Sequence, residues 1–360
     1  MTTSPCLPRD AKEIAEMLGD VANDFSGKTV LMAGGMGFLG RYFQGVFEYL
    51  NHNVLAEPCR LIIADNMITA GKAGISRPRA ATLVDSGNFE FSQVDVSGGF
   101  EVEGPVDFVI NLAGIASPYY YRAYPVETLD VAVNGTRHLL DLARDKGARF
   151  TFFSSSEIYG DPDAKHIPTP ESYRGNVSCR GPRACYDESK RLGETLCYIY
   201  HDTYGTPTNT IRPFNVYGPG MQEADYRVLP NFASCIKGSR TLKVYGTGNQ
   251  TRTFCYVTDA INGFLRVVAR GVPGEAYNIG NPTPEISVFE LVEEIEKVLG
   301  KSIDKEVIEY PDSYPADEPN RRCPDIVKAR RQLDYNPQVT IADGLKRFFE
   351  WTDETYVGEE

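Results

Sequence analysis

The stretch that decides the fold is residues 29–40, TVLMAGGMGFLG. A short apolar run is followed at once by Gly34, Gly37 and Gly40, and a helix-like segment comes next. Glycine adopts the dihedral angles of a tight turn and lets the backbone approach a phosphate closely. The free N–H groups at the start of a helix also bind phosphate. The stretch therefore predicts a dinucleotide-binding strand–turn–helix unit.

Further apolar runs follow along the chain, and helix-like segments, 126–146 and 187–202 among them, separate most of these runs. The expected strands are 61–64, 89–94, 106–113, 150–153 and 208–212. Strands that alternate with helices build a parallel sheet covered on both faces. We expect an α/β fold with a Rossmann-type, doubly wound parallel sheet.

After Pro213 the sequence becomes richer in proline, glycine and tyrosine, which indicates a smaller C-terminal α/β lobe that binds the substrate. The elements expected after Pro213 are strands 242–245 and 276–279 and helices 257–269, 288–299 and 341–351, some of which return to the first domain. At the other end, residues 10–24 have helical spacing. The expected division is an N-terminal extension (1–26), a Rossmann domain (27–212, with a returning segment at about 253–280) and a substrate lobe (213–252 and 281–351).

Composition excludes several classes of function. The 37 basic and 49 acidic residues give a net charge of −12, which disfavours binding to nucleic acid or to an anionic membrane. No apolar run is long enough to cross a membrane, and the first residues do not resemble a targeting signal. The eight cysteines contain no C-x-x-C pair, so we expect reduced thiols, no metal site and a cytoplasmic protein.

The second expected strand ends in Asp65, whose carboxylate suits the hydroxyls of a ribose and would repel a 2′-phosphate. This favours NAD over NADP, although the basic residues Lys72, Arg77 and Arg79 keep the alternative open. Asp95 ends the third strand and would contact adenine or cap a turn. The residues expected at the dinucleotide are Gly34, Gly37, Phe38, Leu39, Gly40, Asp65, Asn66, Asp95, Val96 and Ala113, with Tyr186 and Lys190.

Tyr186 and Lys190 are four residues apart and share one face of a helix. An ammonium there would lower the pKa of the tyrosine and make it a base for a hydroxyl group. The alternative is a surface tyrosine beside a solvated lysine. Residues 154–157, SSSE, end an expected central strand, where ligands of parallel sheets bind. A serine could orient the hydroxyl, while Glu157 suggests chemistry beyond the oxidised carbon.

These motifs together resemble the extended short-chain dehydrogenase/reductase superfamily, the NAD-dependent epimerase/dehydratase family of nucleotide-sugar enzymes. Three segments resemble its UDP-glucuronate decarboxylases (UDP-xylose synthases): 181–188 (GPRACYDE), 244–252 (VYGTGNQTR) and 321–326 (RRCPDI). The resemblance covers residues 27–350. It implies that NAD oxidises the sugar at C4, that CO2 leaves, and that the ketone is reduced again to UDP-xylose or remains as the 4-keto form.

The resemblance also implies roles for residues. Tyr186 would be the base, Ser155 would bond O4, and Ser156 and Glu157 would act around the C5 step. The expected substrate contacts are Ser117, Arg183, Asn215, Arg252, Tyr256 and Arg322, the last at the substrate carboxylate. The family implies a homodimer joined by a four-helix bundle of segments 126–146 and 184–202.

Three positions depart from the family pattern. Ser155 replaces a threonine, Ala132 replaces a helix asparagine, and the loop 118–121 differs. Three other functions stay open: a 4-epimerase, which needs Tyr186 and Lys190 but not Glu157, a 4,6-dehydratase, and an NAD-binding protein without turnover.

Overall fold

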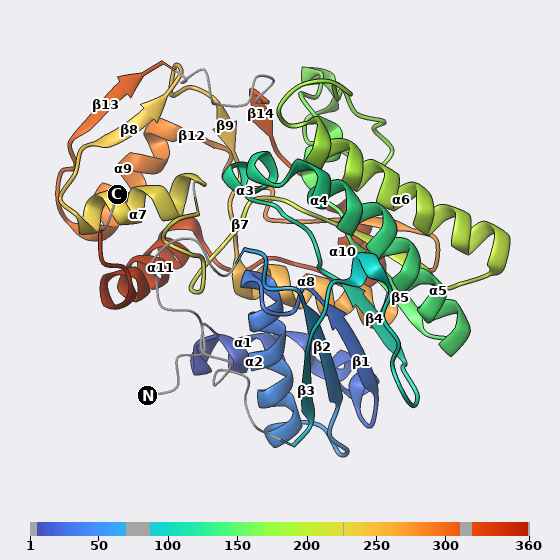
Figure 1. Ribbon diagram of the computed structural model, residues 1–360. Helices are drawn as coiled ribbons and strands as arrows, with labels where there is room; N and C mark the ends of the chain where they lie inside the picture. The colour runs from blue at the N-terminus through green and yellow to red at the C-terminus, as the bar shows by residue number, and fades with distance from the viewer. Residues whose placement is uncertain (1–5, 70–86, 226, 310–318, 359–360) are drawn as a thin grey trace.

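The computed structural model describes residues 6–69, 87–225, 227–309 and 319–358 (Figure 1). The basic residues Lys72, Arg77 and Arg79, which bear on the choice between NAD and NADP, lie outside these ranges.

A seven-stranded parallel sheet forms the centre of the molecule, in the order β11-β6-β5-β4-β1-β2-β3. Its strands are β1 (Thr29–Ala33), β2 (Arg60–Asp65), β3 (Phe89–Gln93), β4 (Phe108–Asn111), β5 (Arg149–Phe153), β6 (Thr208–Pro213) and β11 (Ala276–Ile279). The expected doubly wound sheet is confirmed. The strand order reverses between β1 and β4, and ligands of such sheets bind at this switch point.

Helices cover both faces of the sheet (Figure 1). One face carries α1 (Pro8–Leu18), α2 (Phe38–Asn53) and α8 (Val257–Arg270), and the other carries α5 (Thr136–Lys146) and α6 (Ala184–Tyr204). Along β1, Val30 and Met32 enter the core of the first face, whereas Leu31 and Ala33 enter that of the second. This alternation within a fully buried strand is typical of a parallel sheet with two covered faces.

The N-terminal segment belongs to the body of the protein. The expected helix at 10–24 is shorter than predicted, because α1 ends before Gly19 (φ 56°) and a 3₁₀ turn, Gly19–Phe25, follows. Ile14 and Phe25 are fully buried in the core shared with α2 and α8. The segment is therefore an integral part of the first helical layer.

The expected continuous helix at 126–146 is also interrupted. It consists of α4 (Pro125–Asp130), a π-helical turn at Val131–Gly135 and then α5. Ala132 is buried in this turn, while the amide of Asn134 bonds the Asp130 carboxylate at 3.2 Å on the exposed side. Asn134 therefore does not take the place of the asparagine expected at position 132.

The smaller C-terminal lobe combines three helices with short strands. The helices are α7 (Val228–Lys237), α9 (Val288–Leu299) and α11 (Ile341–Thr355). The strands are β8 (Leu242–Tyr245) with β13 (Lys305–Ile308), β9 (Thr251–Arg252) between β12 (Ile286–Ser287) and β14 (Arg321–Arg322), and β7 (Val216–Tyr217) with β10 (Cys255–Tyr256). Two further helices are α3 (Pro118–Ala123) and α10 (Val327–Leu333).

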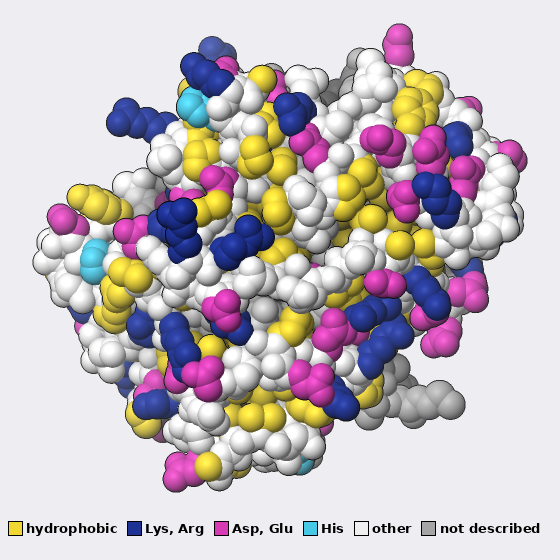
Figure 2. Space-filling model, turned by 180° about the vertical axis from the view of Figure 1, so that it is seen from behind, with side chains coloured by type: hydrophobic (Ala, Val, Ile, Leu, Met, Phe, Trp, Pro, Cys, Tyr) yellow, Lys and Arg dark blue, Asp and Glu magenta, His cyan; other side chains and the backbone are white. Residues whose placement is uncertain are grey.

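The surface carries charges of both signs. On the face seen in Figure 2, basic and acidic side chains are interspersed, and no broad basic area gathers there. None of the helices within the described ranges is long and apolar enough to cross a membrane.

Candidate active site

A large cavity lies over the carboxyl ends of the strands, and residues of both lobes line it. It encloses about 1340 Å³ of space, its open mouth included, which is room for a ligand larger than a monosaccharide. Six of the predicted site residues line it: Glu157, Arg183, Tyr186, Asn215, Arg252 and Arg322. Residues far apart in the sequence therefore meet in one place, as a substrate pocket requires.

Tyr186, Ser155 and Lys190 lie together at the end of β5. Tyr186 is in the first turn of α6, and the side chain of Ser155 is near enough to its hydroxyl to favour the ionised form. One turn further on, Lys190 Nζ donates to the Phe153 carbonyl at 2.8 Å and lies 5.7 Å from the centre of the Tyr186 ring. The ring of Tyr121 stacks on that of Tyr186, with centroids 5.4 Å apart.

The expected acidity of Tyr186 is not present in the protein alone, and here the expectation was wrong. Burial raises the pKa of Tyr186 to about 12 and lowers the pKa of Lys190 to about 8. Both shifts have the same cause, because a low-dielectric interior disfavours the charged form of each group. The lysine alone does not overcome this burial.

Glu157 is held by two arginines. Arg322 donates through Nη1 to Oε1 and through Nη2 to Oε2, both at 2.6 Å, and Arg183 also bonds Oε2. Burial acts to raise the pKa of Glu157, but the charges of Arg322 and Arg183 outweigh it and hold that pKa at about 2. Glu157 is therefore an anion in this arrangement. Arg322 was expected at a substrate carboxylate, and here it binds a carboxylate of the protein.

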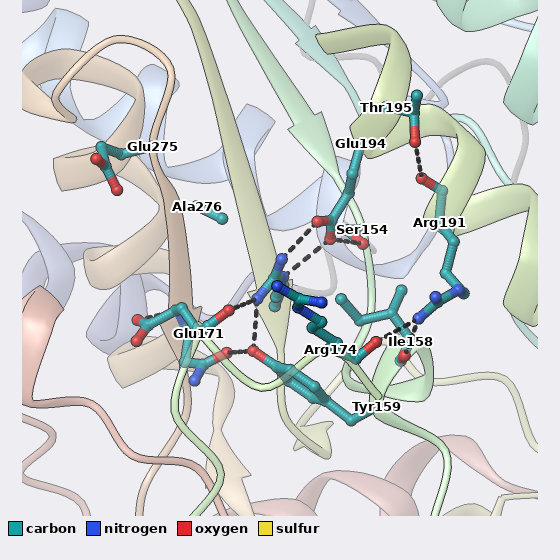
Figure 3. A network of polar contacts seen from close by, with 12 residues as sticks. Ser154, Ile158, Tyr159, Glu171, Arg174, Arg191, Glu194, Thr195, Glu275 and Ala276 are labelled. Carbon is teal, nitrogen blue, oxygen red and sulfur yellow. Dashed lines mark hydrogen bonds and ion pairs between the residues drawn. The ribbon is translucent and has the colours of Figure 1, made fainter. Parts of the chain in front are cut away.

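A buried polar network fixes the turn that carries Ser155 and Glu157 (Figure 3). Glu194 of α6 accepts from Ser154 and from Arg212 Nε (2.9 Å) and Nη2 (2.6 Å). Arg212 Nη1 also donates to the hydroxyl of Tyr159 at 2.7 Å, and Tyr159 donates to Asn278. Strands β5, β6 and β11 are thus tied to the 3₁₀ turn Ser156–Tyr159.

A second cavity adjoins the glycine loop. It is lined by seven of the residues predicted for the dinucleotide: Gly34, Gly37, Asp65, Asn66, Asp95, Val96 and Ala113. Gly34 has φ 75°, and a Cβ there would lie 2.6 Å from the amide nitrogen of Ala113. Gly37 caps α2 without a side-chain bond. Gly34 therefore lets the loop pack closely against the end of β4, and Gly37 borders the cavity at the start of a helix, where a diphosphate can bind.

Other predicted cofactor residues do not line this cavity. Phe38, Leu39 and Gly40 form the first turn of α2, and a Cβ at Gly40 would collide with the carbonyl of Gly35, so this glycine packs the helix against the loop.

Asp65 accepts from the amides of Met36 (2.9 Å) and Met67 (2.8 Å), which orients its carboxylate within the cavity wall.

Two predicted substrate contacts do not line the first cavity. Tyr256 is buried, and its hydroxyl donates to Asp10 at 3.1 Å, so it joins α1 to the lobe instead of lining the cavity. The hydroxyl of Ser117 is buried without a hydrogen-bond partner among the described residues, although its neighbours Ala116 and Pro118 line the cavity. The loop that carries Ser117 is therefore near the site, whereas Tyr256 lies away from the cavity.

A short segment, residues 220–223, is shared by the two cavities; we call it the strap. Met221 lines the first cavity and Gln222 the second. Arg41 Nη2 donates to the Gly220 carbonyl at 2.8 Å, and the Tyr356 hydroxyl donates to the Met221 carbonyl at 2.9 Å. Sequence reasoning missed these contacts, since they join residues more than 100 positions apart.

Similarity to known proteins agrees with this geometry. The model of the NAD dependent epimerase/dehydratase family matches residues 30–280. The chain belongs to this family. Among curated members, it is 38% identical over 320 residues to UDP-glucuronic acid decarboxylase 5 of Arabidopsis thaliana, covering 89% of this chain and 88% of that protein. It is 36% identical over 320 residues to UDP-glucuronic acid decarboxylase 1 of Xenopus tropicalis, with coverages of 89% and 71%.

Solved structures of the epimerase/dehydratase family share the fold. A dTDP-glucose 4,6-dehydratase of Streptomyces venezuelae, crystallised with NAD, superposes with a TM-score of 0.76 at 28% identity, covering 91% of this chain and 97% of that chain. A UDP-glucuronic acid 4-epimerase of Bacillus cereus has a TM-score of 0.75 at 24% identity, with coverages of 91% and 100%. The second likeness supports the fold alone.

Proposed function

We propose that the protein is an NAD-dependent decarboxylase of UDP-glucuronate that forms UDP-xylose or its 4-keto precursor. One observation carries the proposal: Arg322 makes a two-point bond to the carboxylate of Glu157. Both residues line the cavity that Tyr186 also lines. A guanidinium fork recognises carboxylates, and a tyrosine that could deprotonate an alcohol lines the same cavity. The curated relatives, which carry the name UDP-glucuronic acid decarboxylase, support the same activity.

The second cavity fits NAD. Its glycine loop borders the cavity at the start of α2, and Asp65 offers a carboxylate to a ribose. When bound, the nicotinamide supplies an acceptor for hydride from C4 of the sugar and returns the hydride later. Gly34, Gly37 and Asp65 would hold the dinucleotide.

Tyr186 would take the proton of the C4 hydroxyl, which Ser155 orients. The pKa of about 12 disfavours ionised Tyr186 in the protein alone, so the positive charge of Lys190 is needed close by. The carbonyl of Phe153 keeps that ammonium in place. A base with a pKa closer to the working pH transfers protons more effectively.

Arg322 would bind the carboxylate of the uronate. Oxidation at C4 makes this group a β-keto acid, and CO2 then leaves because the ketone accepts the electron pair. Ser156 and Glu157 would deliver the proton to C5. Arg252 and Asn215, which line the same cavity, would contact the diphosphate, with Ser117 near the sugar.

Release of CO2 tests the proposal. UDP-glucuronate labelled with ¹⁴C at the carboxyl group is incubated with the protein and NAD, and trapped radioactivity is counted. We expect radioactive CO2 in amounts equal to the nucleotide sugar consumed. Consumption of the sugar without radioactive CO2 would favour a 4-epimerase, and no consumption at all would favour a binding protein without turnover.

We also propose that the protein is a cytoplasmic homodimer that pairs through α4 and α6. Support comes from large apolar side chains exposed on these helices: Val126 (62%), Leu129 (40%), Leu192 (44%), Tyr198 (62%) and Ile199 (40%). Four helices, two from each subunit, would bury them. Light scattering should give twice the monomer mass, and Leu192→Asp should shift it to the monomer. A monomer in the unmodified protein would contradict the proposal.

A further inference from the structure

Two arginines and two carboxyl groups form a compact charged cluster in the wall of the first cavity. Arg183 lies between Glu157, which accepts from its Nη2, and Asp187, whose Oδ2 is 3.6 Å from its Nε. Arg322 completes the cluster on the far side of Glu157. Arg183, Arg322 and Asp187 are each at most 8% exposed. With both carboxyl groups ionised, the cluster has no net charge.

Asp187 is the weakly bound member of this cluster. Its only ion pair among the described residues is the 3.6 Å contact to Arg183, and its Oδ1 is buried without a hydrogen-bond partner among them. A buried carboxylate with so few partners is costly to keep charged. Burial and the charge of Glu157 raise the pKa of Asp187 to about 7. The other groups that face it are Arg183, Arg322 and the Tyr186 hydroxyl.

Entry of a uronate would disturb this balance. Under the proposed function the substrate carboxylate binds Arg322, so that three carboxyl groups would face two guanidinium groups. The charge of Arg252 also reaches Glu157, but under the proposed function the diphosphate would bind Arg252 and match that charge. An uncompensated charge in a buried site is strongly unfavourable.

We propose that Asp187 is the charge-balancing residue of the site: it takes up a proton when a nucleotide uronate binds and loses one after decarboxylation. The inference rests on the proposed function. In the reaction, the C5–C6 bond breaks, its electron pair stays on the sugar as an enolate, and CO2 leaves. That pair then bonds a proton at C5. One proton is consumed for each carboxylate lost, which equals the one proton that Asp187 takes up on binding. After decarboxylation the cluster again consists of two guanidinium and two carboxylate groups.

Isothermal titration calorimetry counts these protons. NAD-loaded protein carrying Tyr186→Phe, which should slow turnover strongly, is titrated at pH 7.5 in buffers with different enthalpies of ionisation. UDP-glucuronate is compared with UDP-xylose, which has no carboxylate. We expect net uptake of up to about one proton per site with UDP-glucuronate and none with UDP-xylose. Adding Asp187→Asn should abolish the uptake, whereas Glu188→Gln, an exposed neighbour on the same helix, should leave it unchanged.

Equal proton counts for the two ligands would overturn the inference, and so would uptake that persists in the Asp187→Asn protein. If that variant does not fold, the comparison of the two ligands still decides. Release of CO2 by the protein with Tyr186 intact separates this failure from a failure of the proposed function. If CO2 is released but no proton is taken up, only the role of Asp187 is contradicted. If no CO2 is released, the proposed function and the role of Asp187 are both contradicted.

Discussion

The ammonium of Lys190 donates to the carbonyl of Phe153 at 2.8 Å and makes no ion pair among the described residues. Its pKa is lowered to about 8 by burial. A cation kept in the core with one carbonyl partner costs folding free energy, and the function of the tyrosine beside it accounts for its presence. The position is therefore one where stability and activity oppose each other.

We predict that Lys190→Met stabilises the NAD-free protein at pH 7 by roughly 2–3 kcal/mol and abolishes activity. The pKa of Lys190 is lower in the folded chain (about 8) than its ordinary value of 10.5. The unfolded chain thus binds more protons between these values, and stability rises with pH across this window. Calorimetric melting at pH 7 and 9.5 should show that Lys190→Met raises the free energy of unfolding by less at the higher pH. Lys346→Met, at an exposed position, is the control.

Removal of the Tyr186 hydroxyl should lower kcat by roughly 10²–10⁴-fold, because a base in direct contact with the reacting hydroxyl is lost. The packing of the ring against Tyr121 would remain. The Tyr186→Phe protein should bind UDP-glucuronate with little change in affinity, measured by calorimetry. Tyr198→Phe, on the exposed side of the same helix, should keep full activity. Normal turnover by Tyr186→Phe would remove the tyrosine from the chemistry.

Glu157→Gln separates a decarboxylase from a 4-epimerase. The change keeps the size of the side chain and removes the charge that binds Arg322. We expect CO2 release to fall by roughly 10²-fold or more, since an acid–base group is lost. A 4-epimerase does not need this carboxylate, so unchanged turnover would make epimerisation the better hypothesis. Glu188→Gln is the matched control.

Arg41→Gln should weaken retention of the cofactor. The variant loses the bond that ties the start of α2 to the strap, which forms part of both cavity walls. Loss of a charge-assisted hydrogen bond makes release of NAD roughly tenfold faster. The NAD content per subunit after desalting measures this effect. Arg330→Gln, at an exposed site, should retain NAD as the unmodified protein does.

The parts that the sequence predicted correctly depend on local patterns. The strand and turn at residues 29–40 follow from an apolar run and three glycines, and the first β-strands follow from similar runs. Tyr186 and Lys190 share a helix face because four residues make about one turn. These features need no knowledge of distant contacts.

The parts that were missed depend on contacts between distant segments. The two-residue strands β9 and β14 have too few residues for a periodic pattern, yet they place Arg252 beside Arg322. The burial that raises the pKa of Tyr186 arises from the packing of several elements. The pairing of Tyr256 with Asp10 spans 246 positions, and no local pattern indicates it.

The most direct test of the account is proton NMR of UDP-glucuronate incubated with the protein and NAD in D2O. The account predicts a five-carbon product, UDP-xylose or its 4-keto form, with one deuterium at C5, because the enolate left by CO2 takes its proton from a site that exchanges with solvent. A six-carbon product that retains its carboxylate, such as the 4-epimer, would contradict it.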